Sequence, residues 1–146
     1  MKINKKEITA LIEEAKKVRK YAFSHRSEHK IGASVLTYDG EIFGGCNIES
    51  VISGLGTCAE RSAINHAVVH GKYRIKAICT VDKHFTPSCG ACLQYALLFS
   101  QVTKKDIIVI NADLKGKYEL DKLSHLLPEG YKTENKLRLI QSYGKE

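Results

Sequence analysis

Residues 75–81 read Ile-Lys-Ala-Ile-Cys-Thr-Val, an apolar run that predicts a buried strand. Residues 106–111, Asp-Ile-Ile-Val-Ile-Asn, predict a second, central strand. Between these two runs, residues 90–100 carry apolar side chains at helical spacing. A helix that separates two buried strands favours a sheet covered by helices, as in α/β proteins.

The flanking segments continue this alternation of helices and strands. Upstream, the apolar spacing predicts a helix over Lys5–Phe23, strands over Ile31–Thr37 and Glu41–Ile48 joined by a turn at Asp39-Gly40, and a helix over Cys58–His70. Downstream, it predicts an edge strand at Tyr118–Leu120, a helical turn at Lys122–Leu126 and a helix over Glu134–Gln141. The expected fold is a three-layer α/β/α arrangement with a mixed central sheet, in one domain over residues 1–146.

The composition is that of a globular protein. Of 146 residues, 43% are hydrophobic and only 2 are proline, which argues against disorder. No apolar run reaches the ~20 residues of a membrane span. The first seven residues also lack the apolar stretch of a secretory signal. We therefore expect a cytoplasmic protein without a membrane partner.

Charge and cysteine content separate the remaining classes of function. The formal net charge is +7, but the lysines are scattered or paired, which favours a solvated surface over a nucleic-acid interface. The five cysteines are more informative, because an odd number without a secretion signal argues against a disulfide framework. The cysteine content therefore favours metal binding or catalysis.

Two short segments each place a cysteine at the start of a predicted helix: residues 57–61, Thr-Cys-Ala-Glu-Arg, and residues 87–92, Pro-Ser-Cys-Gly-Ala-Cys. A helix N-terminus favours thiolate over thiol. Cys89 and Cys92 have the spacing that lets two sulfurs reach one ion, and Cys58 can supply a third. Three ligands leave the fourth tetrahedral position to water, so we predict one catalytic Zn²⁺ per chain.

Two residues beside Cys58 complete the predicted catalytic group. Glu60 follows Cys58 by two residues and is close enough to take a proton from water and return it to a leaving group. Three thiolates leave zinc with a net charge of −1, which makes it a poor acid. Arg61 offsets this charge if it donates hydrogen bonds to thiolate sulfur.

The cysteines and histidines also admit alternative roles. The C-x-x-C spacing occurs in redox pairs as well, although thioredoxin-type motifs follow the first strand of a different element order. A closed structural metal site would need Cys46 or Cys79 as a fourth ligand, but packing is the favoured role of both. His66 and His70 are four residues apart without an H-E-x-x-H motif, which favours surface or packing roles.

These motifs resemble the cytidine deaminase family, in its small-subunit, three-cysteine zinc class. The resemblance extends from about Tyr21 to Tyr131 and includes residues 45–49, Gly-Cys-Asn-Ile-Glu, which match the family's C-N-V-E. It also includes Leu-Leu-Pro at residues 126–128.

The resemblance implies hydrolytic deamination of cytidine and deoxycytidine at C4, with release of ammonia, in pyrimidine salvage. It implies that Glu60 moves a proton to N3 and then to the departing amine. Asn47 and Glu49 would hold the ribose, and the main chain at Ala59 would read the base edge. The implied assembly is a homotetramer in which Tyr131 reaches into a neighbouring subunit's site.

The sequence departs from the family around the implied pocket. His29 stands where the family commonly has a phenylalanine that packs on the nucleoside, which makes His29 a candidate substrate contact. Ser53 replaces a frequent tyrosine, Pro87-Ser88 stands in place of Ser-Pro, and Leu93 replaces an arginine. These changes spare the catalytic residues.

The departures and the net charge motivate two further hypotheses. One is deamination of a modified cytosine nucleoside, such as blasticidin S or an N4-substituted cytidine. The other is a zinc-stabilised module that binds or edits RNA. No aromatic-rich strand or basic run offers the stacking platform that an RNA-binding module needs.

Overall fold

A five-stranded mixed sheet forms the centre of the computed structural model, which describes residues 2–145. Its strands are β1 (Gly32–Thr37), β2 (Ile42–Cys46), β3 (Ile75–Asp82), β4 (Ile108–Asp113) and β5 (Tyr118–Lys122). They lie in the order β2-β1-β3-β4-β5. β3 and β4 are parallel, and every other neighbouring pair is antiparallel. The predicted mixed sheet is confirmed.

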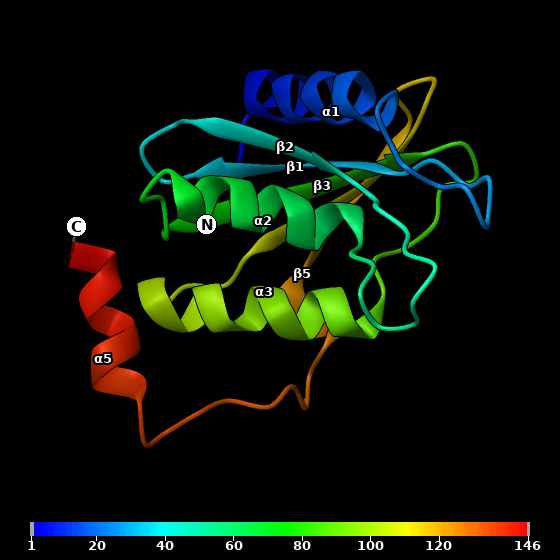
Figure 1. Cartoon of the computed structure of the whole chain (residues 1–146). Helices are drawn as coiled ribbons and strands as arrows, with labels where there is room; N and C mark the ends of the chain where they lie inside the picture. The colour runs from blue at the N-terminus through cyan, green and yellow to red at the C-terminus, as the bar shows by residue number, and fades with distance from the viewer. Residues whose placement is uncertain (1, 146) are drawn as a thin grey trace.

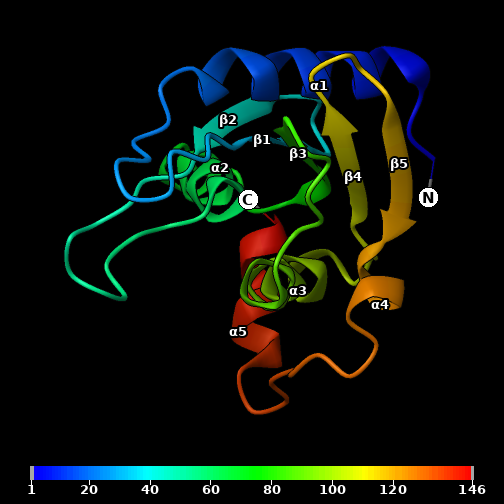
Figure 2. The same cartoon turned by 90° about the vertical axis from the view of Figure 1, so that its right-hand side faces the viewer.

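Helices cover both faces of the sheet (Figure 1). One face carries α1 (Lys5–Arg19), and the other carries α2 (Ala59–Val69) and α3 (Gly90–Thr103). The chain ends with α4 (Leu123–Leu126), α5 (Leu137–Ser142) and the 3-10 turn η1 (Tyr143–Lys145). Figure 1 and Figure 2 together show α5 at the C-terminal end of α3, which it crosses. The predicted three-layer α/β/α fold is thereby confirmed.

The first helix is shorter than predicted. It ends at Arg19, whereas the apolar spacing extends it to Phe23. The backbone of Phe23 instead pairs with the segment after β2: the Phe23 amide donates to the Asn47 carbonyl, and the Glu49 amide donates to the Phe23 carbonyl. These long-range bonds compete with helical bonding and draw the chain towards the edge of the sheet.

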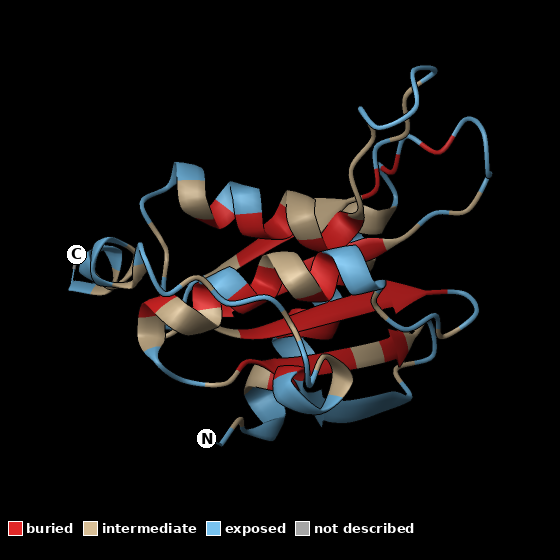
Figure 3. Ribbon diagram, turned by 90° about the horizontal axis from the view of Figure 1, so that it is seen from below, coloured by how far each residue is buried: buried red, intermediate tan, exposed pale blue. Residues whose placement is uncertain are grey.

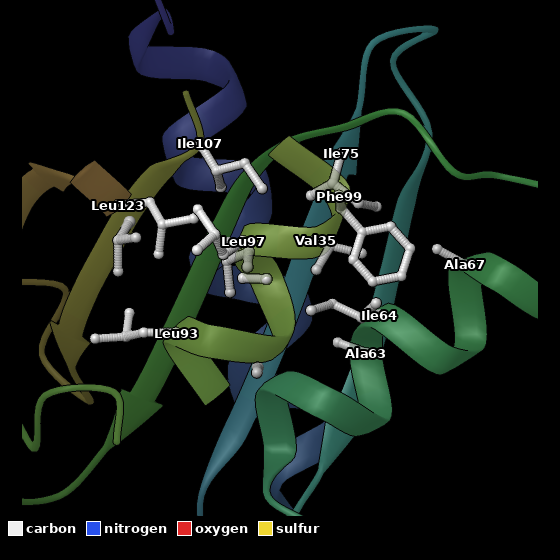
Figure 4. Packing of buried hydrophobic residues seen from close by; sticks show 14 of the residues in the cluster. Val35, Ala63, Ile64, Ala67, Ile75, Leu93, Leu97, Phe99, Ile107 and Leu123 are labelled. Atoms are coloured by element: carbon white, nitrogen blue, oxygen red, sulfur yellow. The ribbon is translucent and has the colours of Figure 1, made fainter. Parts of the chain in front are cut away.

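Two apolar clusters hold the layers together. Leu11, Ala15 and their neighbours on α1 pack against one face of the sheet. On the other face, Ile64 of α2 and Leu97 of α3 meet Val35 of β1 (Figure 4). Figure 3 shows the same division: most of the sheet and the sheet-facing sides of the helices are buried, whereas the edge strand β5 is exposed.

Gly45 lets α2 lie unusually close to the sheet. A Cβ atom at Gly45 would stand 2.2 Å from the Ala63 amide nitrogen and 2.7 Å from the Ala59 carbonyl oxygen. Only a residue without a side chain fits there. The close contact fixes the first turns of α2, which follow directly on Cys58.

The N-terminal ends of α2 and α3 lie at the same end of the layered structure. Three loops gather beside them, residues 20–31, 47–58 and 83–89 (Figure 1, right). Loops carried by a rigid sheet are a common place for binding and catalytic residues. Within residues 2–145, no helix has the length and apolar character needed to cross a membrane.

Candidate active site

Three thiols meet where α2 and α3 begin. Cys58 is the N-cap of α2 and Cys89 the N-cap of α3, and Cys92 lies in the first turn of α3. Neither N-cap thiol makes a capping hydrogen bond to its own helix. All three sulfurs lie within 4.8 Å of one another. The structure thus brings together the three cysteines that the sequence singles out.

The thiol cluster fits a single zinc ion. Zn–S bonds of about 2.3 Å place two sulfurs of a tetrahedral site about 3.8 Å apart, so small side-chain rotations complete the geometry. Among the described residues, the cluster contains no fourth Cys, His, Asp or Glu ligand. Cys79 is fully buried in β3, and burial raises the pKa of its thiol to about 12. Cys79 therefore has a packing role, as predicted.

The electrostatics of the cluster favour a bound cation. Hydrogen bonding with Cys92, and secondarily with Arg61, lowers the pKa of Cys58 to about 5 although burial opposes it. The pKa of Cys92 is raised, first by its hydrogen bond with Cys58, then by burial and by the charge of Glu60. The negative charge of one thiolate therefore opposes the ionisation of the next thiol. A divalent cation among the sulfurs removes this conflict, because metal ligation deprotonates thiols.

Arg61 lies beside the thiol cluster, at the place where the sequence predicts a positive group. Its Nη2 atom lies 3.8 Å from the Cys58 sulfur. The Arg61 Nε atom is buried and has no protein partner in residues 2–145. The positive charge of the guanidinium therefore lies beside the Cys58 sulfur.

A cavity of about 650 Å³ opens in front of the cluster. Cys58 and Cys89 form part of its wall, together with Glu60, which is 5% exposed. Asn47 and Glu49 contribute to the same cavity from the segment after β2. Its size lies within the roughly 300–1,000 Å³ of small-molecule sites.

Ala59 lies between Cys58 and Glu60 at the first residue of α2 and is fully buried. Its side chain does not belong to the described cavity wall. Ala59 as a whole is absent from the described cavity wall, so the expected contact of its main chain with the base edge stays a prediction.

Asn47 ties two loops of the cavity together. Its Oδ1 atom accepts a hydrogen bond from the Ile31 amide, and its Nδ2 atom donates to the His29 carbonyl, both at 2.9 Å. A side-chain amide has two N–H groups and two acceptor positions. One donor and one acceptor position are therefore left for a ligand.

The Glu49 carboxylate also accepts hydrogen bonds from a loop of the cavity. Its Oε2 atom accepts from the amides of Arg26 and Ser27, and its Oε1 atom accepts from the Ser27 hydroxyl. These bonds, chiefly that from the Ser27 hydroxyl, lower the pKa of Glu49 and keep it ionised. A carboxylate has about four acceptor positions. Glu49 thus retains one for a hydroxyl donor.

His29 lies in the cavity wall, where its Nε2 atom is 3.0 Å from Oδ2 of Asp82. Sequence reasoning missed Asp82, the last residue of β3, because nothing local marks a carboxylate at a strand end as a partner for a residue in another loop. Among the departures from the family pattern, Ser53 also lines the cavity. Leu93 is buried in the core, and Ser88 lies 3.3 Å from the Thr80 hydroxyl.

Tyr131 lies apart from the described cavity. Its amide and carbonyl bond to the Gln94 side chain, at 2.8 Å each, and the residue is 77% exposed. Tyr131 lines a smaller hollow of about 340 Å³ that also includes Arg61. The structure therefore places Tyr131 on an outer surface, outside the cavity that Cys58 and Cys89 line.

Three thiols that leave a coordination position open, with a carboxylate beside them in a cavity wall, are the arrangement of a hydrolytic zinc enzyme. The sequence model of the cytidine and deoxycytidylate deaminase zinc-binding region matches residues 5–109. The chain therefore belongs to the cytidine deaminase family.

Similar proteins agree with this assignment. The chain is 34% identical to cytidine deaminase from Sporosarcina psychrophila over 88% of its own length and 94% of the relative. It superposes on the crystal structure of cytidine deaminase from Burkholderia pseudomallei with a TM-score of 0.77 at 35% identity, covering 84% of this chain and 98% of that one. Blasticidin-S deaminase from Bacillus cereus is 27% identical over 72% of this chain and 79% of its own.

Proposed function

We propose that the chain is a zinc-dependent deaminase that converts cytidine and deoxycytidine, with water, to uridine or deoxyuridine and ammonia. One observation carries the proposal: Cys58, Cys89 and Cys92 lie within 4.8 Å of one another at one end of a cavity that Glu60 also lines. The fold, the match to the family and the relatives named cytidine deaminase support the same conclusion.

The protein's own residues supply the proton transfers. Zinc, when bound by the three cysteines, acts as a Lewis acid that lowers the pKa of water towards neutrality. Glu60 accepts the proton from the attacking water and delivers it to N3 of the cytosine ring. It then takes the remaining proton from the hydroxyl now on C4 and passes it to the amino group, so that the C4 carbonyl forms as the C–N bond breaks and ammonia leaves. Because Glu60 is largely buried beside the ligands, little solvent competes for this proton.

The residues after β2 are suited to bind the sugar. Asn47 has one free N–H group and one free acceptor position, and Glu49 has one acceptor position left. Ribose hydroxyls both donate and accept, so they match this combination. Family membership further supports a contact between the base edge and the main chain at Ala59, which directly precedes Glu60.

A modified cytosine nucleoside is not favoured as the substrate. Identity to the blasticidin-S deaminase is lower, and over a smaller part of the chain, than to the cytidine deaminase of Sporosarcina psychrophila. A role in RNA binding has no comparable support, because the described cavity wall includes no phenylalanine, tyrosine or tryptophan on which successive bases could stack.

Family membership supports a proposal for the assembly and the cellular role. We infer that residues 1–146 act as one deaminase domain, in a homotetramer, in the cytoplasm and in pyrimidine salvage. Exposed apolar side chains support an interface beside the cavity: Val51 is 84% exposed and Leu55 69%. Tyr131 would contact a neighbouring subunit from its exposed position.

A substrate panel tests the proposed function. The zinc-loaded protein is given cytidine, deoxycytidine, blasticidin S, an N4-methylated cytidine and single-stranded RNA at equal concentration, and ammonia release is followed. We expect the highest kcat/KM for cytidine or deoxycytidine. Faster turnover of a modified nucleoside, or of cytosine within RNA, would overturn the assignment.

A further inference from the structure

His29 and Asp82 form a pair that the deamination chemistry leaves unused. His29 lies in the loop before β1 and Asp82 is the last residue of β3, 53 positions away, and they meet at 3.0 Å between Nε2 and Oδ2. The Asp82 side chain is 1% exposed and that of His29 33% exposed. A buried carboxylate thus holds one end of an imidazole whose remaining surface lies in the cavity wall.

Asp82 fixes the protonation pattern of the imidazole. Burial raises the pKa of Asp82, but hydrogen bonds, chiefly those from the Thr86 hydroxyl and amide, outweigh burial and lower it below its usual range. An ionised carboxylate only accepts hydrogen bonds, so the ring nitrogen that faces it must carry the proton. In the neutral imidazole, Nδ1 then has a free lone pair. Among the described residues, no side chain or amide donates to Nδ1.

The orientation of the ring is also fixed. The imidazole of His84 stacks on that of His29 with ring centroids 5.5 Å apart and an interplanar angle of 19°. The carbonyl of His29 accepts from Nδ2 of Asn47, the residue suited to bind the sugar. His29 is therefore next to the sugar-binding residues, with one ring face covered and one nitrogen occupied.

We propose that Nδ1 of His29 accepts a hydrogen bond from a hydroxyl of the nucleoside sugar, and that Asp82 is a positioning residue that holds the imidazole in the tautomer required. The pair then determines specificity, because it distinguishes a nucleoside with that hydroxyl from one without it. This inference rests on the proposed function, since it concerns the substrate of the same cavity. A phenylalanine at this position would keep an aromatic ring but could not accept such a bond.

His29→Phe is the direct test, because it keeps an aromatic ring and removes the acceptor. kcat/KM is measured for cytidine and for its 2′-deoxy, 3′-deoxy and 5′-deoxy analogues with both proteins. With the wild type, we expect kcat/KM for one analogue to be about 3- to 10-fold lower than for cytidine, which corresponds to the loss of one hydrogen bond. With His29→Phe, we expect kcat/KM for that analogue to equal that for cytidine. The proposal is overturned if His29→Phe leaves the ratio of kcat/KM between cytidine and each analogue unchanged. This holds even if the variant lowers kcat/KM for all four substrates by the same factor.

Binding of the product separates this test from the proposed function. Dissociation constants of uridine and its three deoxy analogues are measured by calorimetry with both proteins. If cytidine is not deaminated, the proposed function fails. The role of His29 is still supported if wild type binds uridine more tightly than one deoxy analogue and His29→Phe binds the two equally. If uridine binds equally well with and without each hydroxyl, or does not bind, the role of His29 is refuted.

Asp82→Asn tests the positioning role. The amides of His84 and Thr86 donate to Oδ1 of Asp82, so they orient the replacement with its amide nitrogen towards His29. That nitrogen donates to Nε2 and shifts the ring proton to Nδ1. We expect ¹⁵N NMR of labelled histidine to show this change of tautomer, together with loss of discrimination against the same analogue.

Thr86→Val is the matched control. It removes the hydroxyl that donates to Oδ2 of Asp82 and leaves the contact with His29 in place. The amides of His84 and Thr86 still donate to Oδ1 and keep Asp82 ionised, so we expect the tautomer and the substrate ratio to be retained in this variant. Equal loss of discrimination in Thr86→Val and Asp82→Asn, with no change of tautomer in either, would reduce Asp82 to a structural role.

Discussion

The guanidinium Nη2 of Arg61 lies 3.8 Å from the sulfur of Cys58, one turn away on the same helix. This contact places a positive charge beside three thiolates that together outweigh the charge of one zinc ion. Groups that bond to metal ligands tune both the affinity and the acidity of the site.

Arg61→Gln should weaken zinc binding about 10- to 100-fold, as is typical when a partner of a metal ligand is lost. Competition with a chelator of known affinity measures the effect. Arg26→Gln is the matched control, because Arg26 lines the same cavity but contributes only its amide, to Glu49. Equal zinc affinity in wild type and Arg61→Gln would show that Arg61 does not support the thiolates.

Zinc content should distinguish the clustered cysteines from the others. Cys89→Ala removes one of three ligands, so we expect the purified variant to lose most of its zinc. Cys46→Ala removes a half-buried thiol outside the cluster, and its zinc content should match that of the wild type. Elemental analysis with protein quantification measures both. A Cys46→Ala protein without zinc would argue for a closed four-thiolate site.

Gly45→Ala should destabilise the fold by about 1 to 3 kcal/mol, the usual cost of overpacking a core. The added methyl would meet the backbone of Ala59 and Ala63, so α2 must move away from the sheet. Gly90→Ala is the control, since a Cβ there meets nothing within 4 Å. Urea unfolding measures both variants, and equal stability would show that α2 is not tightly held by Gly45.

The ion pair between Glu7 and Lys76 should make stability depend on pH. The bond from Lys76, and then that from the Asn4 amide, lowers the pKa of Glu7 in the folded state. A lowered folded pKa stabilises the fold above the unfolded carboxyl pKa of about 4.3, and this stabilisation is lost as the pH falls through the folded value.

Glu7→Gln should therefore cost about 0.5 to 1 kcal/mol at neutral pH, and the difference should vanish in acid. Glutamine keeps the side-chain oxygen that accepts from the Asn4 amide, so only the charge changes. Glu13→Gln, whose pair with Lys16 is more exposed, should change stability less. A difference at Glu7 that persists at acidic pH would contradict an ionic origin of the effect.

Local rules were sufficient to predict most of the fold and the centre of the site. Cys58 and Cys89 begin helices, and glycine or proline in the preceding loops together with apolar spacing makes helix starts readable from sequence. The end of α1 was not predictable, because the bonds between Phe23 and the segment around Asn47 join parts of the chain that only the folded sheet brings together.

The contact between His29 and Asp82 was hidden for the same reason. Both residues are polar and lie in or beside loops, and no spacing relates them along the chain. The position of Tyr131 was equally unreadable, because the Gln94 side chain fixes it from α3. Contacts of this kind depend on tertiary structure, whereas the motif of Cys58 and Glu60 is contained in one helical turn.

The most direct test of the account measures zinc content and ammonia release from cytidine in one preparation each of wild type and Glu60→Gln. The substitution keeps the size of the side chain and removes its capacity to carry a proton. We predict about one zinc per chain in both proteins and turnover lower by at least ~10²-fold in the variant, the usual contribution of general acid–base catalysis. Near-normal turnover by a zinc-loaded Glu60→Gln protein would contradict the account.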